Sequence, residues 1–389
     1  MENYSVKTDY EDIRPLNDDE VESAIQELLN SKGFLDAVKS FNPAMTKERL
    51  TQKMSPCKTK ACFKETLSRD AVEAIANKTT FSLTLSGRSL IAKDLRPHTY
   101  ISNHRDIVLD ASFLNVLLYN AGIGMTQVAI GDNLFIQSWI ETLVRLNNSF
   151  KVRRGVSMAE RLDASNKLSS YIRHTINETK ESVWIAQREG RAKDSNDLTQ
   201  PGLLKMLAMS GSSKNMAENL KGMDLVPVSI SYEIDPCDYL KAKEFQLKRD
   251  DPNYVKTAQD DLESMYAGVL GYKGRVHLSL APPVNDALAE MAIGLKRRND
   301  IFPLLASYID CEIYKRYRLY PRNYVAYDML TGINRYEERY GTKDKKEFEE
   351  YINGQIEKID IPNKDVSFLR IKLLEMYTNP LINNLKSSL

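Results

Sequence analysis

The chain contains little cysteine, with four residues in a length of 389. Four cysteines in a chain of this size do not form a disulfide framework. Cys57 and Cys62 lie five residues apart, and no second pair follows them at the spacing of a metal site. We therefore expect four reduced thiols in a cytoplasmic protein.

An excess of charge of one sign is also missing. The 54 basic and 53 acidic residues leave a net charge of +1, so no overall field attracts nucleic acid. One stretch, residues 314–322, mixes basic and aromatic side chains as a stacking surface for nucleic acid would. In a neutral protein we expect it to form an amphipathic helix packed on the rest of the molecule, with a membrane-facing helix as the alternative.

The chain has no long uninterrupted apolar run. The longest run without charge, residues 111–131, has the length of a membrane span. Polar residues and glycines interrupt it, namely Asn115, Asn120, Gly122, Gly124 and Gln127. A helix, a glycine turn and a strand explain this run better than a membrane span does. The first twenty residues are acidic and polar, unlike a signal peptide, so any membrane contact is expected to be peripheral.

Helical and strand patterns alternate in the middle of the chain. Strand patterns occupy residues 81–87, 98–103, 125–131, 149–154, 182–187, 225–233 and 272–281. Helical patterns lie between most of them, which predicts an α/β fold with a mixed, partly parallel sheet flanked by helices. We expect an N-terminal helical region at 1–80, an α/β domain at 81–284 and a C-terminal helical extension at 285–389. One helix should carry its apolar residues near one face: Met158, Leu162, Leu168, Ile172 and Ile176.

One of the four histidines, His104, stands between an apolar strand and an apolar helix, in "YISNHRDIVLDAS". Its triplet His-Arg-Asp also begins the catalytic loop of protein kinases. However, the position of the metal-binding asparagine in that loop holds Ala111. The chain also lacks a D-F-G triplet and a G-x-G-x-x-G loop, and a kinase cannot function without these parts.

A histidine and an aspartate at such a junction can catalyse acyl transfer to an alcohol. A neutral imidazole takes the proton that the attacking hydroxyl loses, and a carboxylate orients the imidazole and stabilises its cation. Asp106 is placed to cap a helix that starts at Ile107. Asp110 would lie one turn further in, on an apolar helix where a carboxylate needs a partner. We expect Asp110 to pair with His104, and Asp106 is the alternative.

Four sequence blocks, in order, resemble the glycerol-3-phosphate and lysophospholipid acyltransferase superfamily over about residues 80–285. They are "YISNHRDIVLD", "IGDNLFIQSWIETLVRLNNSFKVRRG", "WIAQREGRAKDSNDLTQPGLLKM" and "LVPVSISYE". The first is similar to a strand followed by N-H-x-S-x-x-D, and the third to an E-G-x-R-S motif followed by P-x-x-G. The chain departs from the family pattern in two places. The spacing from His104 to Asp110 is one residue longer than in that pattern, and the motif at Glu189 is E-G-R, one residue shorter than E-G-x-R.

The resemblance implies a set of catalytic and substrate-binding residues. His104 would be the general base and Asp110 its partner. The fork of an arginine side chain fits two phosphate oxygens. Alternation along the strand at 149–154 is expected to place Arg153 and Arg154 on opposite sides. The resemblance favours Arg154 as the phosphate-binding residue. The substrate-binding residues implied are Arg105, Asn133, Arg153, Arg154, Glu189, Gly190, Arg191 and Lys193.

The resemblance also implies the reaction and its substrates. An acyl group would pass from acyl carrier protein or coenzyme A to a hydroxyl of glycerol 3-phosphate or 1-acylglycerol 3-phosphate, in phospholipid synthesis. Neither a metal nor another cofactor is expected, and the protein would be cytoplasmic, with any membrane association a peripheral one at the inner face of the cell membrane. Two alternatives remain: another lipid acceptor, such as an acylated amino acid, and a non-catalytic lipid-binding protein of the same fold.

Overall fold

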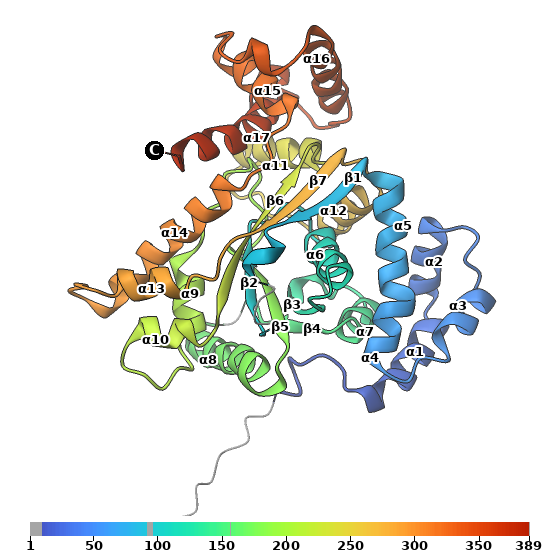
Figure 1. Cartoon of the computed structure of the whole chain (residues 1–389). Helices are drawn as coiled ribbons and strands as arrows, with labels where there is room; N and C mark the ends of the chain where they lie inside the picture. The colour runs from blue at the N-terminus through green and yellow to red at the C-terminus, as the bar shows by residue number, and fades with distance from the viewer. Residues whose placement is uncertain (1–9, 92–95, 156, 389) are drawn as a thin grey trace, which may run out of the picture.

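A single seven-stranded sheet lies at the centre of the computed structural model, which describes residues 10–91, 96–155 and 157–388 (Figure 1). The first nine residues of the predicted N-terminal region lie outside the described residues. Each predicted strand is confirmed. The strands are β1 (Ser82–Ser86), β2 (Thr99–Ser102), β3 (Thr126–Gly131), β4 (Ser149–Val152), β5 (Ser182–Ala186), β6 (Leu225–Tyr232) and β7 (Arg275–Leu280).

The sheet is mixed and mostly parallel, as predicted, with the strand order β1-β7-β6-β2-β5-β3-β4. Strands β2 to β6 run in the same direction, and β7 pairs antiparallel with β6. The carboxyl ends of β2, β3, β4, β5 and β6 therefore meet at one edge of the sheet, here called the carboxyl edge. Ligands of open α/β sheets bind outside this edge.

Alternation along the strands divides the core between the two faces of the sheet. Tyr100 and Ile101 are both fully buried but belong to separate apolar clusters, because successive side chains point to opposite faces. One cluster includes residues of α5 (Arg69–Thr79), α6 (Leu109–Asn120) and α12 (Ala258–Leu270). The other includes residues of α8 (Met158–His174), α9 (Pro201–Ala208), α10 (Met216–Lys221), α13 (Asn285–Met291) and α14 (Ile301–Lys315).

The predicted helical regions at both ends of the chain are confirmed (Figure 1). The N-terminal helices share a core with residues of α7; they are α1 (Val21–Asn30), α2 (Lys32–Phe41), α3 (Lys47–Met54) and α4 (Lys60–Phe63), and α7 spans Ser138–Leu146. The last three helices share a core with Ala242 of α11 (Asp238–Asp250). These are α15 (Pro321–Thr331), α16 (Thr342–Glu357) and α17 (Val366–Lys386).

The basic and aromatic stretch at 314–322 is not a single helix. It contains the end of α14, a short link and the start of α15. Tyr314, Tyr317 and Tyr320 are buried, so the stretch packs inside the protein instead of facing a membrane. Among the described residues, no helix combines the length and the apolar character needed to span a bilayer.

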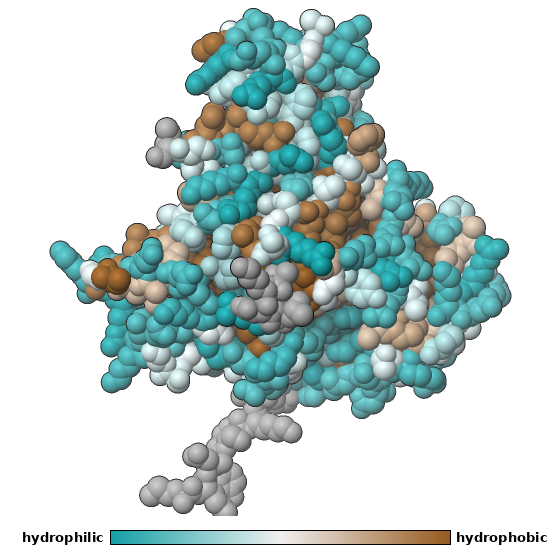
Figure 2. All heavy atoms as spheres, viewed as in Figure 1, coloured by the Kyte–Doolittle hydropathy of each residue, from teal (hydrophilic) through white to brown (hydrophobic). Residues whose placement is uncertain are grey.

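The prediction for α8 is wrong at its N-terminal end. Leu168, Ile172 and Ile176 are buried as expected, but Met158 is 84% exposed and Leu162 is 61% exposed. The buried residues of the helix begin at Leu168, so its first turns extend beyond the layer packed on the sheet. On the face drawn in Figure 2, exposed apolar residues form patches separated by hydrophilic ones.

Candidate active site

The loop that carries His104 leaves the sheet at the carboxyl end of β2 and is tied to β6 by Asn103. The Asn103 amide donates to the Ile230 carbonyl (2.9 Å) and accepts from the Ile230 N–H (2.8 Å). The side chain thus makes two hydrogen bonds to the β6 backbone just beyond the last strand residue of β2. Our sequence reasoning missed Asn103. Its signal was the first position of the N-H-x-S-x-x-D pattern, but its partner Ile230 lies 127 residues away.

His104 and Asp110 are in contact, as predicted. The distance from His104 Nδ1 to Asp110 Oδ2 is 2.9 Å. The same oxygen accepts from the backbone N–H groups of Arg105 (2.6 Å) and Asp106 (3.0 Å). Asp110 is 1% exposed, so these bonds hold a buried carboxylate in one orientation and, through it, the imidazole.

The other side of the imidazole packs on Trp184. The two ring centroids are 5.9 Å apart, with an interplanar angle of 67°. Trp184 is itself fixed by a bond from Nε1 to Ser102 Oγ (3.0 Å). Nε2 of His104 has no hydrogen-bond partner among the described residues, and the side chain is 14% exposed. With Nδ1 bonded to a carboxylate, Nε2 is the nitrogen that can accept a proton.

Asp106 caps the following helix. Its Oδ1 accepts from the N–H groups of Val108 (2.8 Å) and Leu109 (2.7 Å). Helix α6 begins at Leu109, two residues later than predicted, because residues 107 and 108 form a turn. Burial, together with the charge of Asp110, raises the pKa of Asp106. Its Oδ2 lies so close to α12 that a Cβ at Gly268 would approach it to 2.0 Å.

Arg105 does not reach the surface of this site. Its side chain is 6% exposed and is paired with Asp197 at 3.5 Å. It also donates to the Tyr317 hydroxyl at 3.4 Å. His104 and Arg105 are consecutive, so their side chains leave the loop in different directions, and only His104 faces Asp110. The implied substrate contact of Arg105 is therefore replaced by contacts inside the protein.

Arg154, Asn133 and Glu189 come together at the carboxyl edge. The Arg154 backbone N–H donates to Asp132 Oδ1 (3.0 Å), and its guanidinium lies against Gly131. A Cβ at Gly131 would be 2.4 Å from Arg154 Nε and 2.6 Å from Asn133 Oδ1. Arg154 Nη1 is 3.8 Å from Glu189 Oε1, and the Arg154 side chain is 33% exposed. Such a loose, hydrated pair leaves the guanidinium available to an anion.

Arg153, which alternation was expected to separate from Arg154, pairs with Asp12. Arg153 and Arg154 both line a groove of about 690 Å³, here called the basic groove. Its basic residues are Lys151, Arg153, Arg154, Arg161, Lys167 and Arg188.

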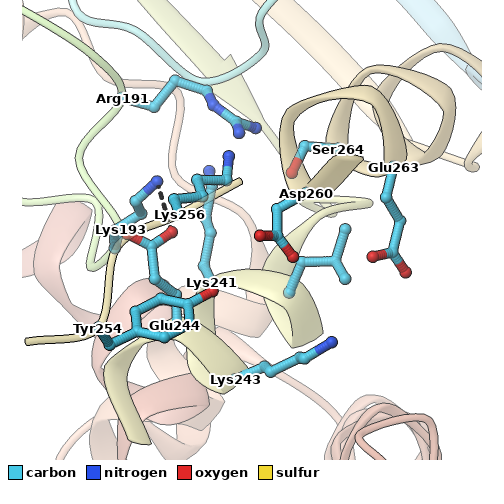
Figure 3. A pocket seen from close by; sticks show the side chains of 11 residues that line it. Arg191, Lys193, Lys241, Lys243, Glu244, Tyr254, Lys256, Asp260, Glu263 and Ser264 are labelled. Carbon is cyan, nitrogen blue, oxygen red and sulfur yellow. Dashed lines mark ion pairs between the residues drawn. The ribbon is translucent and has the colours of Figure 1, made fainter. Parts of the chain in front are cut away.

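Arg191 and Lys193 lie in a different cavity, between the loop after β5 and the helices α11 and α12 (Figure 3). We call it the α11–α12 pocket. Gly190 has a φ of +67°, a left-handed turn that favours glycine. Arg191 is 7% exposed, and its Nη1 has no hydrogen-bond partner among the described residues. In Figure 3, Lys193, Lys241 and Lys256 extend toward the Arg191 guanidinium.

Burial, together with the charge of Arg191, lowers the pKa of Lys193 to about 8. Lys193 Nζ is nevertheless paired with Glu244 at 2.9 Å. The structure thus places two of the implied substrate-binding arginines in separate cavities: Arg154 lines the basic groove and Arg191 the α11–α12 pocket. His104 is not among the residues that line either cavity.

Comparison with known proteins places the His104 loop in a family domain. Residues 84–231 match the family model described as Acyltransferase, and no curated protein matches the chain. The match runs from within β1 to the end of β6 and includes His104, Asp110, Arg154 and Arg191. Residues 84–231 are therefore an acyltransferase domain, which supports an acyltransferase enzyme.

Proposed function

We propose that the protein moves a fatty acyl group from a thioester, on acyl carrier protein or coenzyme A, to a hydroxyl of glycerol 3-phosphate or 1-acylglycerol 3-phosphate. The observation that carries the proposal is the state of His104. Nδ1 is fixed on Asp110 at 2.9 Å, and Nε2 has no partner in the part of the chain that the structure describes. This is the arrangement of a general base that waits for a substrate hydroxyl.

The chemistry follows from this geometry. His104 Nε2 takes the hydroxyl proton as the hydroxyl oxygen attacks the thioester carbonyl carbon. The tetrahedral intermediate then collapses, the carbon–sulfur bond breaks, and the imidazolium returns the proton to the leaving thiolate. Asp110 stabilises the imidazolium in between. The acyl group passes directly to the acceptor, without an acylated enzyme.

The α11–α12 pocket would hold the phosphate of the acceptor. Its space of about 20 Å³ is little more than that of one water molecule, so the side chains that line it would have to move apart to admit a phosphate. Nη1 of Arg191 is buried there and has no hydrogen-bond partner within the described ranges, and charge-assisted hydrogen bonds to phosphate are strong. Arg191 also lies close enough to Asp106, two residues from His104, for the two charges to interact.

The proposal is tested by replacing His104 with alanine. His104→Ala should lower the rate of acyl transfer by about 10²–10⁴, the usual contribution of a general base. Assays would combine labelled acyl carrier protein or acyl-coenzyme A with each glycerol phosphate, and with an acylated amino acid. His174→Ala is a matched control, because His174 is exposed on α8.

Circular dichroism and thermal unfolding would show that both variants are folded. A folded His104→Ala protein with full activity would exclude the proposed base. If only the acylated amino acid were acylated, His104 would still be the proposed base, but the acceptor would not be a glycerol phosphate.

A further inference from the structure

One oxygen of the Asp110 carboxylate has no role in the catalysis described above. Oδ2 accepts from the imidazole and from two backbone N–H groups. Oδ1 is buried and has no hydrogen-bond partner among the described residues. Leaving a buried acceptor without a partner costs free energy, and most buried polar atoms in proteins are bonded. We therefore looked for a donor beside this oxygen.

The hydroxyl of Tyr232, the last residue of β6, is such a donor. Its oxygen is also buried and has no hydrogen-bond partner within the described ranges. Burial, together with the negative charge of Asp110, raises the pKa of Tyr232 well above its usual value. The two groups are therefore close neighbours, and the hydroxyl keeps its proton at any pH at which the enzyme would work.

Contacts on two sides hold Tyr232 in this place. Phe113 lies three residues after Asp110, on the same side of α6, and its ring centroid is 6.4 Å from that of Tyr232. The Asn103 amide binds the β6 backbone at Ile230, two residues before Tyr232. The end of β6 is thus fixed both to the start of the loop that carries the imidazole and to the first turns of α6.

We infer that Tyr232 is a positioning residue of the active site, whose hydroxyl donates to Asp110 Oδ1 while Oδ2 holds the imidazole of His104. The inference rests on the proposed function, in which His104 is the general base. A carboxylate that is bonded at both oxygens cannot turn, so Oδ2 stays directed at Nδ1 as the imidazolium forms. The bond is charge-assisted, and such bonds are stronger than those between neutral groups.

The first test removes the hydroxyl and keeps the ring that packs on Phe113. Tyr232→Phe should lower kcat by about tenfold or more, because a hydrogen bond to a charged group is lost. The Michaelis constants of the acyl donor and of the acceptor should change less than about twofold, because Tyr232 acts through Asp110 and not on a substrate.

Tyr100→Phe is a matched control on the neighbouring strand β2. Tyr100 is fully buried, and its hydroxyl also has no hydrogen-bond partner in the part of the chain that the structure describes. The carboxylate whose charge acts on it is Asp224, not Asp110. Tyr100→Phe should therefore leave kcat within about twofold of the wild-type value. An equal loss in both variants would show that the loss comes from any buried hydroxyl and would contradict the inference.

A double variant separates positioning from a direct effect on the substrate. In Asp110→Ala the hydroxyl of Tyr232 has no carboxylate to hold. Adding Tyr232→Phe to Asp110→Ala should therefore lower kcat less than about twofold further, because residues that act as a unit are not additive. A further loss as large as that of Tyr232→Phe alone would mean that Tyr232 does not act through Asp110.

Nuclear magnetic resonance tests the arrangement without turnover. The full-length protein would be labelled with ¹⁵N-histidine and studied with no substrate present. The proton on His104 Nδ1, which is bonded to Asp110, would be assigned by its loss in His104→Ala. Tyr232→Phe should shift this resonance, because Asp110 loses a donor at its other oxygen, and Tyr100→Phe should leave it unchanged.

Two further results would overturn the inference. The first is an unchanged Nδ1 resonance in a Tyr232→Phe protein that circular dichroism shows to be folded. The second is a higher Michaelis constant of either substrate with kcat unchanged, which would place Tyr232 against the substrate. Because the resonance is measured without substrate, a protein with another acceptor would still show the shift. Failure of the proposed function is thus distinguishable from failure of this inference.

Discussion

At the scale of single residues, Asp106 and Asp110 differ in what their oxygens accept. Asp110 Oδ2 accepts from the imidazole and from two backbone N–H groups, whereas Asp106 Oδ1 accepts only from the helix start. Asp110→Asn should therefore approach the loss of rate of His104→Ala. Asp106→Ala should cost about 0.5–2 kcal/mol of stability, as for a lost cap, with a smaller loss of rate.

Kinetics and urea denaturation of the two variants would separate these roles. The opposite pattern, with the larger loss of rate in Asp106→Ala, would make Asp106 the partner of His104.

The lowered pKa of Lys193 predicts how acceptor binding depends on pH. Burial sets this pKa at about 8, so the ammonium is charged at pH 7 and mostly neutral at pH 9. A phosphate monoester, with a second pKa of about 6, stays dianionic over this range. The Michaelis constant of the acceptor should therefore rise from pH 7 to pH 9 by up to about tenfold, and that of the donor should change less.

In Lys193→Arg the side chain stays charged at pH 9, so the Michaelis constant of the acceptor should change less between pH 7 and pH 9. If wild type and Lys193→Arg gave the same dependence, Lys193 would have no role in holding the phosphate.

At the scale of elements, α8 changes surroundings along its length. Leu162 is 61% exposed and Leu168 is 9% exposed, although both belong to the same apolar pattern. Leu162→Ala should change the free energy of unfolding by less than about 0.5 kcal/mol, whereas Leu168→Ala should cost about 2–5 kcal/mol through the cavity it leaves. Urea denaturation of this matched pair is the measurement, and equal costs would mean that the first turns of α8 are packed in solution.

At the scale of the whole molecule, α14 belongs to the core of the sheet. Seven of its residues lie in the same buried cluster as Ile101, Val183 and Leu225 of the strands: Ile301, Phe302, Leu305, Ala306, Ile309, Ile313 and Tyr314. Asp310 of α14 also accepts from the Thr199 backbone N–H (2.8 Å) and hydroxyl (2.6 Å). A chain that ends at residue 284, the predicted domain boundary, should therefore lack a cooperative unfolding transition.

Differential scanning calorimetry of the truncated and full-length chains would decide this. A cooperative transition near the temperature of the full-length protein would show that residues 1–284 fold without the extension.

Local patterns in the sequence predicted the strands, the mixed sheet and the helical regions at both ends. The reason is that the periods of 2 and 3.6 residues depend only on neighbours along the chain. The contact between His104 and Asp110 was within reach of the same reasoning, because the two residues lie six positions apart across one strand-to-helix junction.

The sequence by itself determined these elements and the local pair, and only the tertiary structure decided how distant residues share a site. The bonds of Asn103 to Ile230 and of Arg105 to Tyr317 span 127 and 212 residues. The separation of Arg154 and Arg191 into two cavities depends on α11 and α12, which lie outside the family match. Spacing along the chain carries no information about which helices later cover a loop, so the burial and the partners of these arginines could not be read from it.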